Sequence, residues 1–152
     1  MITRRVFLLF SAASAAHAQL PPNIGELRKQ ALDEAIRKVV GGAQVRQGKV
    51  KLDIPPLIDN GNTVPIVVTV ESPMTAAEHV KAIHLFTEKN PQPYVIAAHL
   101  GPRSGRARVV TRARIADTGK VIAIAQLSDG SFWSETVSVV VTLSACLEDG
   151  LI

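Results

Sequence analysis

The sequence contains one cysteine, one tryptophan and one tyrosine, and aromatic residues make up only 4% of it. A single cysteine excludes an internal disulfide framework. The scarcity of aromatic side chains disfavours a single-stranded nucleic-acid platform, because such platforms stack bases on aromatic rings. Beyond the N-terminal region no apolar run is long enough to span a bilayer. We therefore expect neither nucleic acid nor a membrane to be a partner of the folded domain.

The sequence motifs of common catalytic sites are also missing. No glycine-rich phosphate loop opens a predicted helix, and there is no Gly-x-Ser-x-Gly nucleophile elbow. His79, His84 and His99 form no familiar metal-ligand spacing with Cys146. We interpret these histidines as structural or surface residues and expect no catalytic, metal or cofactor site.

Residues 1–18 have the features of an export signal. Arg4 and Arg5 precede an apolar run over residues 7–16, and Ala16-His17-Ala18 then offers small residues at the two positions that a signal peptidase reads. The paired arginines favour the twin-arginine route, which exports folded proteins. We expect cleavage after Ala18 and a periplasmic location. The alternatives are a buried N-terminal helix and a retained membrane anchor.

One amphipathic helix and a series of short strands are predicted for the rest of the chain. Over residues 24–40 apolar side chains recur at three- and four-residue spacing, and Gly41-Gly42 ends the helix. The predicted apolar face consists of Leu27, Ala31, Ala35, Ile36, Val39 and Val40. After that the period changes to two, and turn signals separate strands predicted over residues 50–54, 63–71, 80–87, 94–100, 106–115, 120–127 and 132–143. Pro65 places its strand at a sheet edge or near a bulge, and residues 74–78 could form one helical turn.

Short strands with frequent turns predict a mainly β domain. The fold class we expect is an immunoglobulin-like antiparallel β-sandwich with one N-terminal amphipathic helix. The disulfide and tryptophan spacing of immunoglobulin domains are absent, so the term describes the architecture alone. The chain then divides into a signal peptide (1–18), one sandwich domain (19–143) and a cysteine-bearing tail (144–152).

Four arginines share one face of the strand predicted over residues 106–115. Arg106, Arg108, Arg112 and Arg114 alternate with smaller residues. The simpler interpretation is a solvated outer face of the sandwich. The alternative is a docking patch for an acidic partner or an anionic ligand.

Cys146 lies three residues past the last predicted strand. In an exported protein an unpaired thiol suggests a reactive group or an intermolecular bond. A thiolate on a tail can be presented to another protein's active site, react with a sulfur electrophile and carry the product away. The alternative is an inert cysteine packed against the sandwich end through Leu147 and Leu151.

Several segments, in their order and spacing, resemble a known family. These are Gly48–Leu52, Asn60-Gly61-Asn62-Thr63-Val64-Pro65, the Lys-Ala-Ile-His-Leu-Phe segment that ends at Phe86, Thr111–Arg114 and Ser128–Phe132. Together they resemble SoxY, the sulfur-carrier family of the bacterial thiosulfate-oxidising (Sox) system. The resemblance covers nearly the whole chain after the signal.

The resemblance implies a carrier rather than an enzyme. SoxY-like proteins are sandwiches that form a heterodimer with a second β-sandwich subunit, SoxZ. They hold sulfur intermediates covalently on a C-terminal cysteine, here Cys146, while other Sox enzymes bind transiently and oxidise and hydrolyse the sulfur. No cofactor other than this bound sulfur is implied. For the interface with SoxZ, we regard the strands over residues 64–70 and 80–86 as candidates.

Two other functions stay open. One is a structural or regulatory SoxY paralogue that binds the same partner without carrying sulfur, and the other is a stand-alone periplasmic domain that binds an anionic ligand. The family's arm typically reads Gly-Gly-Cys-Gly-Gly and ends there, whereas here Ser144-Ala145 precede Cys146 and residues 147–152 follow it. We therefore expect the arm to have less backbone freedom. We also expect Glu148 and Asp149 to disfavour the thiolate.

Overall fold

The computed structural model describes residues 23–143. The predicted signal peptide and the tail that carries Cys146 lie outside these residues. One helix and nine strands make up the described part. Their bounds are α1 Ile24–Val40, β1 Val45–Gln47, β2 Val50–Asp53, β3 Leu57–Ile58, β4 Val64–Val70, β5 Val80–Thr87, β6 Tyr94–His99, β7 Arg108–Ala113, β8 Gly119–Leu127 and β9 Phe132–Val141, with a short 3-10 turn at Pro102–Ser104.

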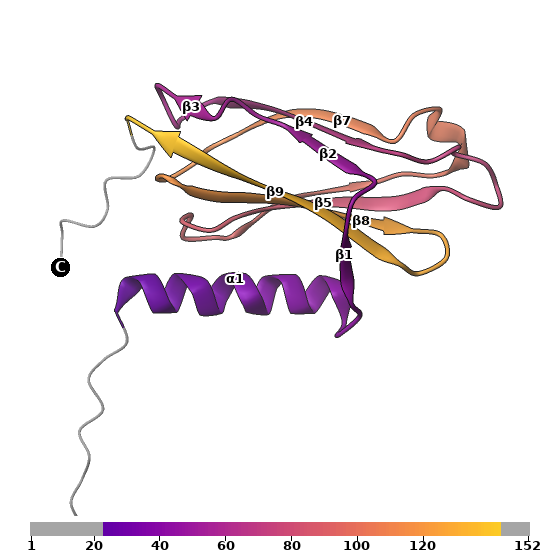
Figure 1. Cartoon of the computed structure of the whole chain (residues 1–152), viewed down its shortest axis with the longest axis horizontal. Coiled ribbons are helices and arrows are strands. Elements are labelled where there is room, and N and C mark those ends of the chain that lie inside the picture. The colour runs from indigo at the N-terminus through magenta and orange to yellow at the C-terminus, as the bar shows by residue number, and fades with distance from the viewer. Residues whose placement is uncertain (1–22, 144–152) are drawn as a thin grey trace, which may run out of the picture.

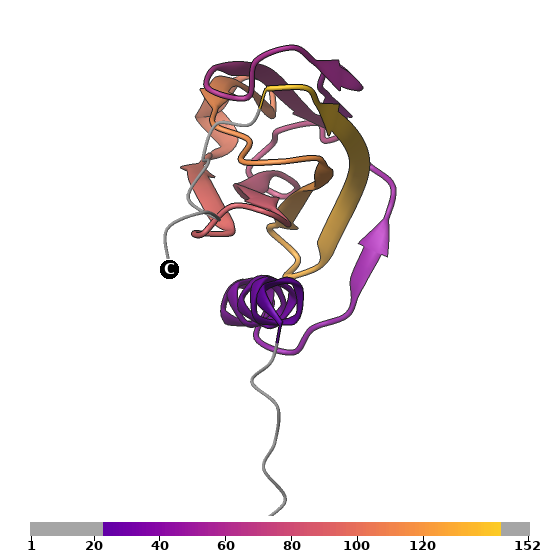
Figure 2. The same ribbon diagram turned by 90° about the vertical axis from the view of Figure 1, so that its left-hand side faces the viewer.

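The fold has three layers (Figure 1). A sheet in the order β2-β4-β7 packs on a larger sheet in the order β1-β9-β8-β5-β6, in which β3 also pairs with β9. Helix α1 covers the outer face of the larger sheet, and Figure 2 shows it end-on below the sandwich. The predicted mainly β sandwich with one N-terminal helix is confirmed. No helix within residues 23–143 is long and apolar enough to cross a membrane.

The three layers enclose two apolar cores. The main core lies between the sheets and includes Ile66, Val68, Leu85 and Val121. A smaller core lies under α1, where Leu32 packs with Phe86, Ile124 and Phe132. Strands β5 and β8 are therefore buried on both faces, which explains why their sequences are almost continuously apolar.

Both ends of α1 are capped. The Asn23 side chain accepts a hydrogen bond from the Glu26 N–H at 2.9 Å, as expected of an N-cap. Gly41, at φ 61°, ends the helix in the left-handed conformation, and its N–H donates to the Arg37 carbonyl. Most of the predicted apolar face is confirmed, because Ala35, Ile36, Val39 and Val40 pack against the smaller core. Its first turn is not, because Leu27 is 48% exposed and Leu32, which was not predicted to belong to this face, is buried.

Three details differ from the sequence-based expectations. Strands β1 and β3 pair with β9 in parallel, whereas every other strand pair is antiparallel. Strand β4 is central rather than at an edge, but Pro65 lies beyond the end of β2, whose last residue pairs with Val67. The N–H that Pro65 lacks therefore leaves no gap in the β2–β4 ladder. Residues 74–78 form no helical turn, because Met74 has a left-handed φ of 53°.

The two strands named as interface candidates differ in what they present to a partner. Strand β5 lies between β8 and β6 and is buried on both faces, so it presents almost nothing to a partner. Strand β4 lies between β2 and β7 and turns Val64, Ile66, Val68 and Val70 into the core, whereas Pro65 and Thr69 are exposed on its outer face.

Candidate functional site

The end of β9 is the base from which the cysteine-bearing tail leaves the sandwich. The N–H groups of Val140 and Thr142 donate to the Pro56 and Ile58 carbonyls, at 2.8 and 2.9 Å, which is the parallel pairing with β3. The Val141 N–H points to the other side of β9, beyond the reach of β8. Strand β8 begins at Gly119, which pairs with Val139. The Thr118 hydroxyl takes the place of the missing strand and accepts this N–H at 2.9 Å.

A turn holds the chain two residues further on. The Gly61 N–H donates to the Leu143 carbonyl at 2.9 Å, and the Gly61 carbonyl accepts from the Ile115 N–H at 2.8 Å. The Thr142 hydroxyl lies 3.0 Å from the Asp59 carbonyl and donates to it. The Asn-Gly-Asn-Thr-Val-Pro segment quoted from the sequence is therefore the turn that fixes the base of the tail. We call Gly61, Thr118, Thr142 and their partners the tail clasp.

A second turn supports the clasp. The Asn90 side chain donates to the Arg114 carbonyl at 2.9 Å and accepts from the Ala116 N–H at 2.8 Å. The Pro93 carbonyl, in the same β5–β6 turn, accepts from the Thr87 N–H. Sequence reasoning identified none of these polar residues as part of a site, and the family resemblance drew attention only to the segment that contains Gly61.

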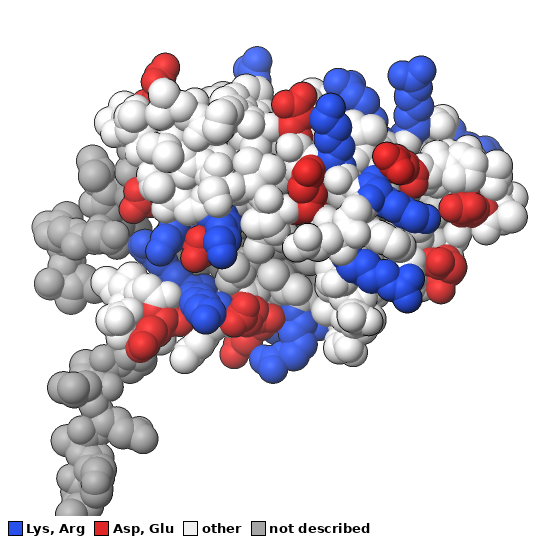
Figure 3. All heavy atoms as spheres, in the orientation of Figure 1, with Lys and Arg blue, Asp and Glu red and all other residues white. Residues whose placement is uncertain are grey.

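An apolar surface surrounds the clasp. Leu57 and Val140 are register partners on β3 and β9 and are 59% and 51% exposed, and Leu143 is 52% exposed. Figure 3 shows little charge over β3 and the end of β9, whereas Lys, Arg, Asp and Glu are mixed elsewhere on that face. Exposed apolar groups gathered in this way are typical of an interaction surface.

The four arginines lie as the alternation predicted. Arg106, Arg108, Arg112 and Arg114 are exposed, whereas Ala107, Ala113 and Ile115 are buried on the opposite face. Strand β7 is an edge strand of the smaller sheet. The four arginines therefore lie on an exposed outer face of the sandwich, and positive charges also protect an edge strand from pairing with other chains.

The structure brings two of the three histidines together. The rings of His84 and His99 lie 6.5 Å apart, and the His84 Nδ1 is 2.8 Å from the Tyr94 hydroxyl. Burial, and then the nearby His99, lower the pKa of His84, and burial raises the pKa of Tyr94. His79 lies apart and contacts the Thr75 carbonyl. Within residues 23–143 no group of three or more His, Cys, Asp or Glu side chains is placed to hold a metal ion.

Comparison with known protein families matches residues 36–146 to the family described as sulfur oxidation protein SoxY. The chain belongs to the SoxY family. The matched segment runs from the second half of α1 to Cys146 and includes the whole tail clasp, whereas residues 147–152 lie beyond it. No curated protein matches the sequence.

Solved structures agree with the SoxY assignment. The sulfur carrier protein SoxY from Chlorobium limicola f thiosulfatophilum is 26% identical, with a TM-score of 0.63 over 75% of this chain and 98% of that protein. Superoxide reductase (neelaredoxin) from Ignicoccus hospitalis is 19% identical, with a TM-score of 0.54 over 79% of this chain and 99% of that one. Superoxide reductase from Nanoarchaeum equitans is 13% identical, with a TM-score of 0.52 over 63% and 100% of the two chains. The likeness to the two reductases concerns the fold alone.

Proposed function

We propose that this SoxY-family protein is a periplasmic carrier of thiosulfate oxidation that holds sulfur intermediates covalently on Cys146. The observation that carries the proposal is the tail clasp, which belongs to the family match and fixes the chain up to Leu143. Three residues further on, Cys146 can lie no more than about 11 Å from the Leu143 Cα. The thiol is thus tethered close to the apolar surface at this end of the sandwich.

The proposed loading step joins the Cys146 sulfur to the terminal sulfur of thiosulfate. The Cys146 thiolate and S₂O₃²⁻ give Cys–S–S–SO₃⁻ and release two electrons, which a redox protein of the same system must accept. Hydrolysis with one water then gives Cys–S–S⁻, sulfate and two protons. The carrier supplies the thiolate and its position, and partner enzymes supply both reactions. The thiolate is the reactive form, so loading slows as pH falls below the pKa of the thiol.

Mass spectrometry of the native protein tests this role. We expect sulfur-containing adducts on Cys146, and we expect Cys146→Ser to abolish loading without a change in thermal stability, because the tail lies beyond the clasp. Turnover of thiosulfate by Cys146→Ser with the partner enzymes would contradict the carrier role. That result would favour the alternative, a SoxY paralogue that binds the same partner without carrying sulfur.

We further propose a SoxZ-like subunit as the stable partner. The apolar surface at the tail clasp is the candidate that we favour, because Leu57, Val140 and Leu143 are each more than half exposed whereas β5 is enclosed. A stable interface buries more than about 1,000 Å², so this surface would be its centre rather than its whole. In co-expression with a SoxZ-like protein, Leu57→Arg should weaken the complex on gel filtration. Val110→Arg, at a 63% exposed position on β7, is the matched control, and equal effects of the two variants would argue against this surface.

The periplasmic location rests on residues 1–18. We expect the protein recovered from the periplasm to begin at or near Gln19, and replacement of Arg4 and Arg5 by lysine to retain it in the cytoplasm. N-terminal sequencing of the fractionated cells is the measurement. Periplasmic protein that begins at Met1 would be inconsistent with a cleaved signal.

A further inference from the structure

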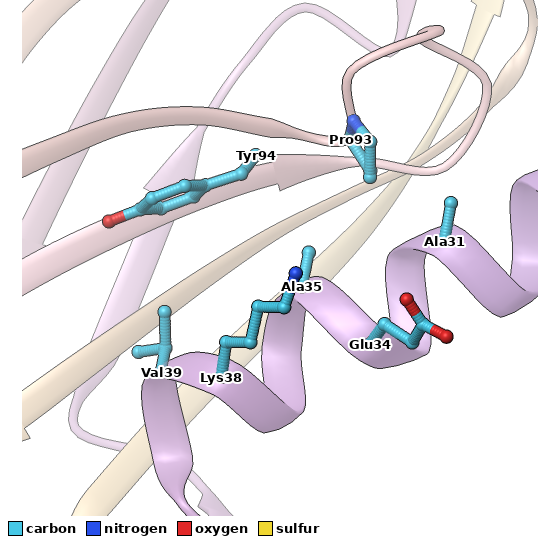
Figure 4. Close-up of a pocket in the computed structure, with 7 residues that line it drawn as sticks. All are labelled: Ala31, Glu34, Ala35, Lys38, Val39, Pro93 and Tyr94. Atoms are coloured by element: carbon cyan, nitrogen blue, oxygen red, sulfur yellow. The ribbon is translucent and has the colours of Figure 1, made fainter.

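A groove of about 500 Å³ lies between α1 and the β5–β6 turn. Figure 4 shows Pro93 and Tyr94 on one side of it, facing the helix residues across open space. From α1 the groove is lined by Ala31, Glu34, Ala35, Lys38 and Val39. It is mainly apolar, with one acidic and one basic side chain at the helix side.

Helix α1 leaves apolar surface exposed beside the groove. Ala35 lines the groove and also packs against the core under α1, whereas Ala31 lines the groove without belonging to that core. Leu27, one turn before Ala31, is 48% exposed, and Tyr94 on the facing strand is 39% exposed. Exposed apolar groups beside a mainly apolar groove are prepared to receive another segment.

The residues that follow Cys146 are suited to this groove by position. A series of hydrogen bonds connects the base of the tail to the groove: Leu143 is bonded to Gly61, Gly61 to Ile115, and the neighbouring Ala116 to Asn90. Asn90 belongs to the same turn as Pro93, which lines the groove. Figures 1 and 2 also place the end of β9 and the β5–β6 turn at the same end of the molecule. From Leu143, an extended chain reaches about 14 Å at Leu147 and about 30 Å at Ile152.

The sequence of this segment is also suitable. Residues 147–152 contain Leu147, Leu151 and Ile152 for an apolar groove, and Glu148 and Asp149 for the Lys38 ammonium at its edge. They lie outside the region that matches the family. The groove is a place for them.

We propose that residues 147–152 bind in the groove between α1 and β6 of the same chain and hold Cys146 against the sandwich. A partner that takes the thiol must first displace this segment, so the groove adds a resting position to the carrier. The role given to Cys146 rests on the proposed function, whereas the docking itself does not.

The rate at which iodoacetamide alkylates Cys146 reports the docking, because the reagent needs an accessible thiol but no sulfur chemistry. If about nine tenths of the molecules are docked, and docking shields the thiol, alkylation is about tenfold slower than in the free tail. Ala31→Trp fills the groove, so we expect it to raise the rate toward that of a chain lacking residues 147–152. The two changes together should raise it no further. Asp33→Trp, at an exposed position on α1 whose neighbours one turn away, Lys29 and Arg37, do not line the groove, is the control and should leave the rate unchanged.

Two further measurements separate docking from its alternatives. Glu148→Gln with Asp149→Asn keeps the apolar residues, so a rate increase in this variant measures the effect of charge on the thiolate. A synthetic peptide with the sequence of residues 147–152, added to the shortened chain, should shift the amide signals of Ala31, Ala35 and Tyr94. The docking proposal is overturned by an unchanged alkylation rate in a folded Ala31→Trp variant, or by a peptide that shifts other residues instead. Protection that increases with protein concentration overturns docking within one chain and assigns the groove to the tail of a second copy. Each of these outcomes leaves the sulfur-loading test of Cys146→Ser unaffected.

Discussion

Thr118→Val is the sharpest test of the tail clasp. The substitution keeps the shape of the side chain but removes the hydroxyl that accepts the Val141 N–H at 2.9 Å and donates to the Val141 carbonyl at 3.4 Å. Val141 is 7% exposed, so water replaces the lost acceptor poorly. Leaving a buried N–H unpaired costs about 1–3 kcal/mol, and we expect about 1–2 kcal/mol here because Thr118 itself is exposed. For a domain of this size the melting temperature should fall by about 4–8 °C.

The loss should be concentrated at the end of β9. Hydrogen exchange measured by NMR should show the Val141 and Thr142 amides exchanging about tenfold faster, since a tenfold change in an opening equilibrium corresponds to about 1.4 kcal/mol. Amides in β5 should change only as much as global stability does. Thr118→Ser keeps the hydroxyl and should resemble the parent, and Thr69→Val, at an exposed position on β4, controls for the change of residue type. A Val141 amide that exchanges at the parent rate in Thr118→Val would refute the clasp.

Three other substitutions test the layers and the buried histidine. Phe86→Ala, in the core under α1 and fully buried, should lower the free energy of unfolding in urea by about 3–5 kcal/mol, whereas Phe86→Leu should cost far less. Gly41→Ala, at φ 61°, should lower it by about 1 kcal/mol because a Cβ is strained in that conformation, which thermal unfolding followed by circular dichroism can measure. Burial and His99 lower the pKa of His84 in the folded protein. Between this lowered pKa and the ordinary pKa of the unfolded chain, the unfolded chain therefore binds more protons than the folded one. The stability that neutral His84 allows is present above the ordinary pKa and is lost as the pH falls through the lowered pKa. The melting temperature should therefore drop from about pH 7.5 to about pH 5, and a smaller drop in His84→Gln is expected; an identical pH profile would show that His84 is not responsible.

Much of the fold was predictable because its long strands carry a clear pattern. The helix over residues 24–40 and all seven predicted strands are present, with bounds that differ by a few residues. The three-residue β1 and the two-residue β3 were not predicted, since so short a segment has no measurable period. Their parallel pairing with β9 depends on tertiary contacts alone. Leu27 and Leu32 show the same limit, because the position of the buried stripe depends on where the helix lies on the sheet.

The candidate site was less predictable than the fold. Cys146 could be named because it is the only thiol in the sequence. The clasp could not, because Thr118 and Gly61 act through a single hydroxyl and a backbone amide that face β9 only after folding. The interface candidates were chosen for their apolar sequences, and in β5 that composition reflects enclosure between neighbouring strands and layers rather than contact with a partner.

The pairing of β9 with both β1 and β3 sets the order in which the chain can be completed. Ser134 and Arg46, hydrogen-bonded at one end of β9, are 88 residues apart, and Thr142 and Ile58, at the other end, are 84 residues apart. Contacts of such long range are slow to form. During synthesis, β1 and β3 stay unpaired until β9, the last strand of the described chain, has left the ribosome. Only then can the clasp close, so an intact base for the tail also indicates that the whole domain has finished folding.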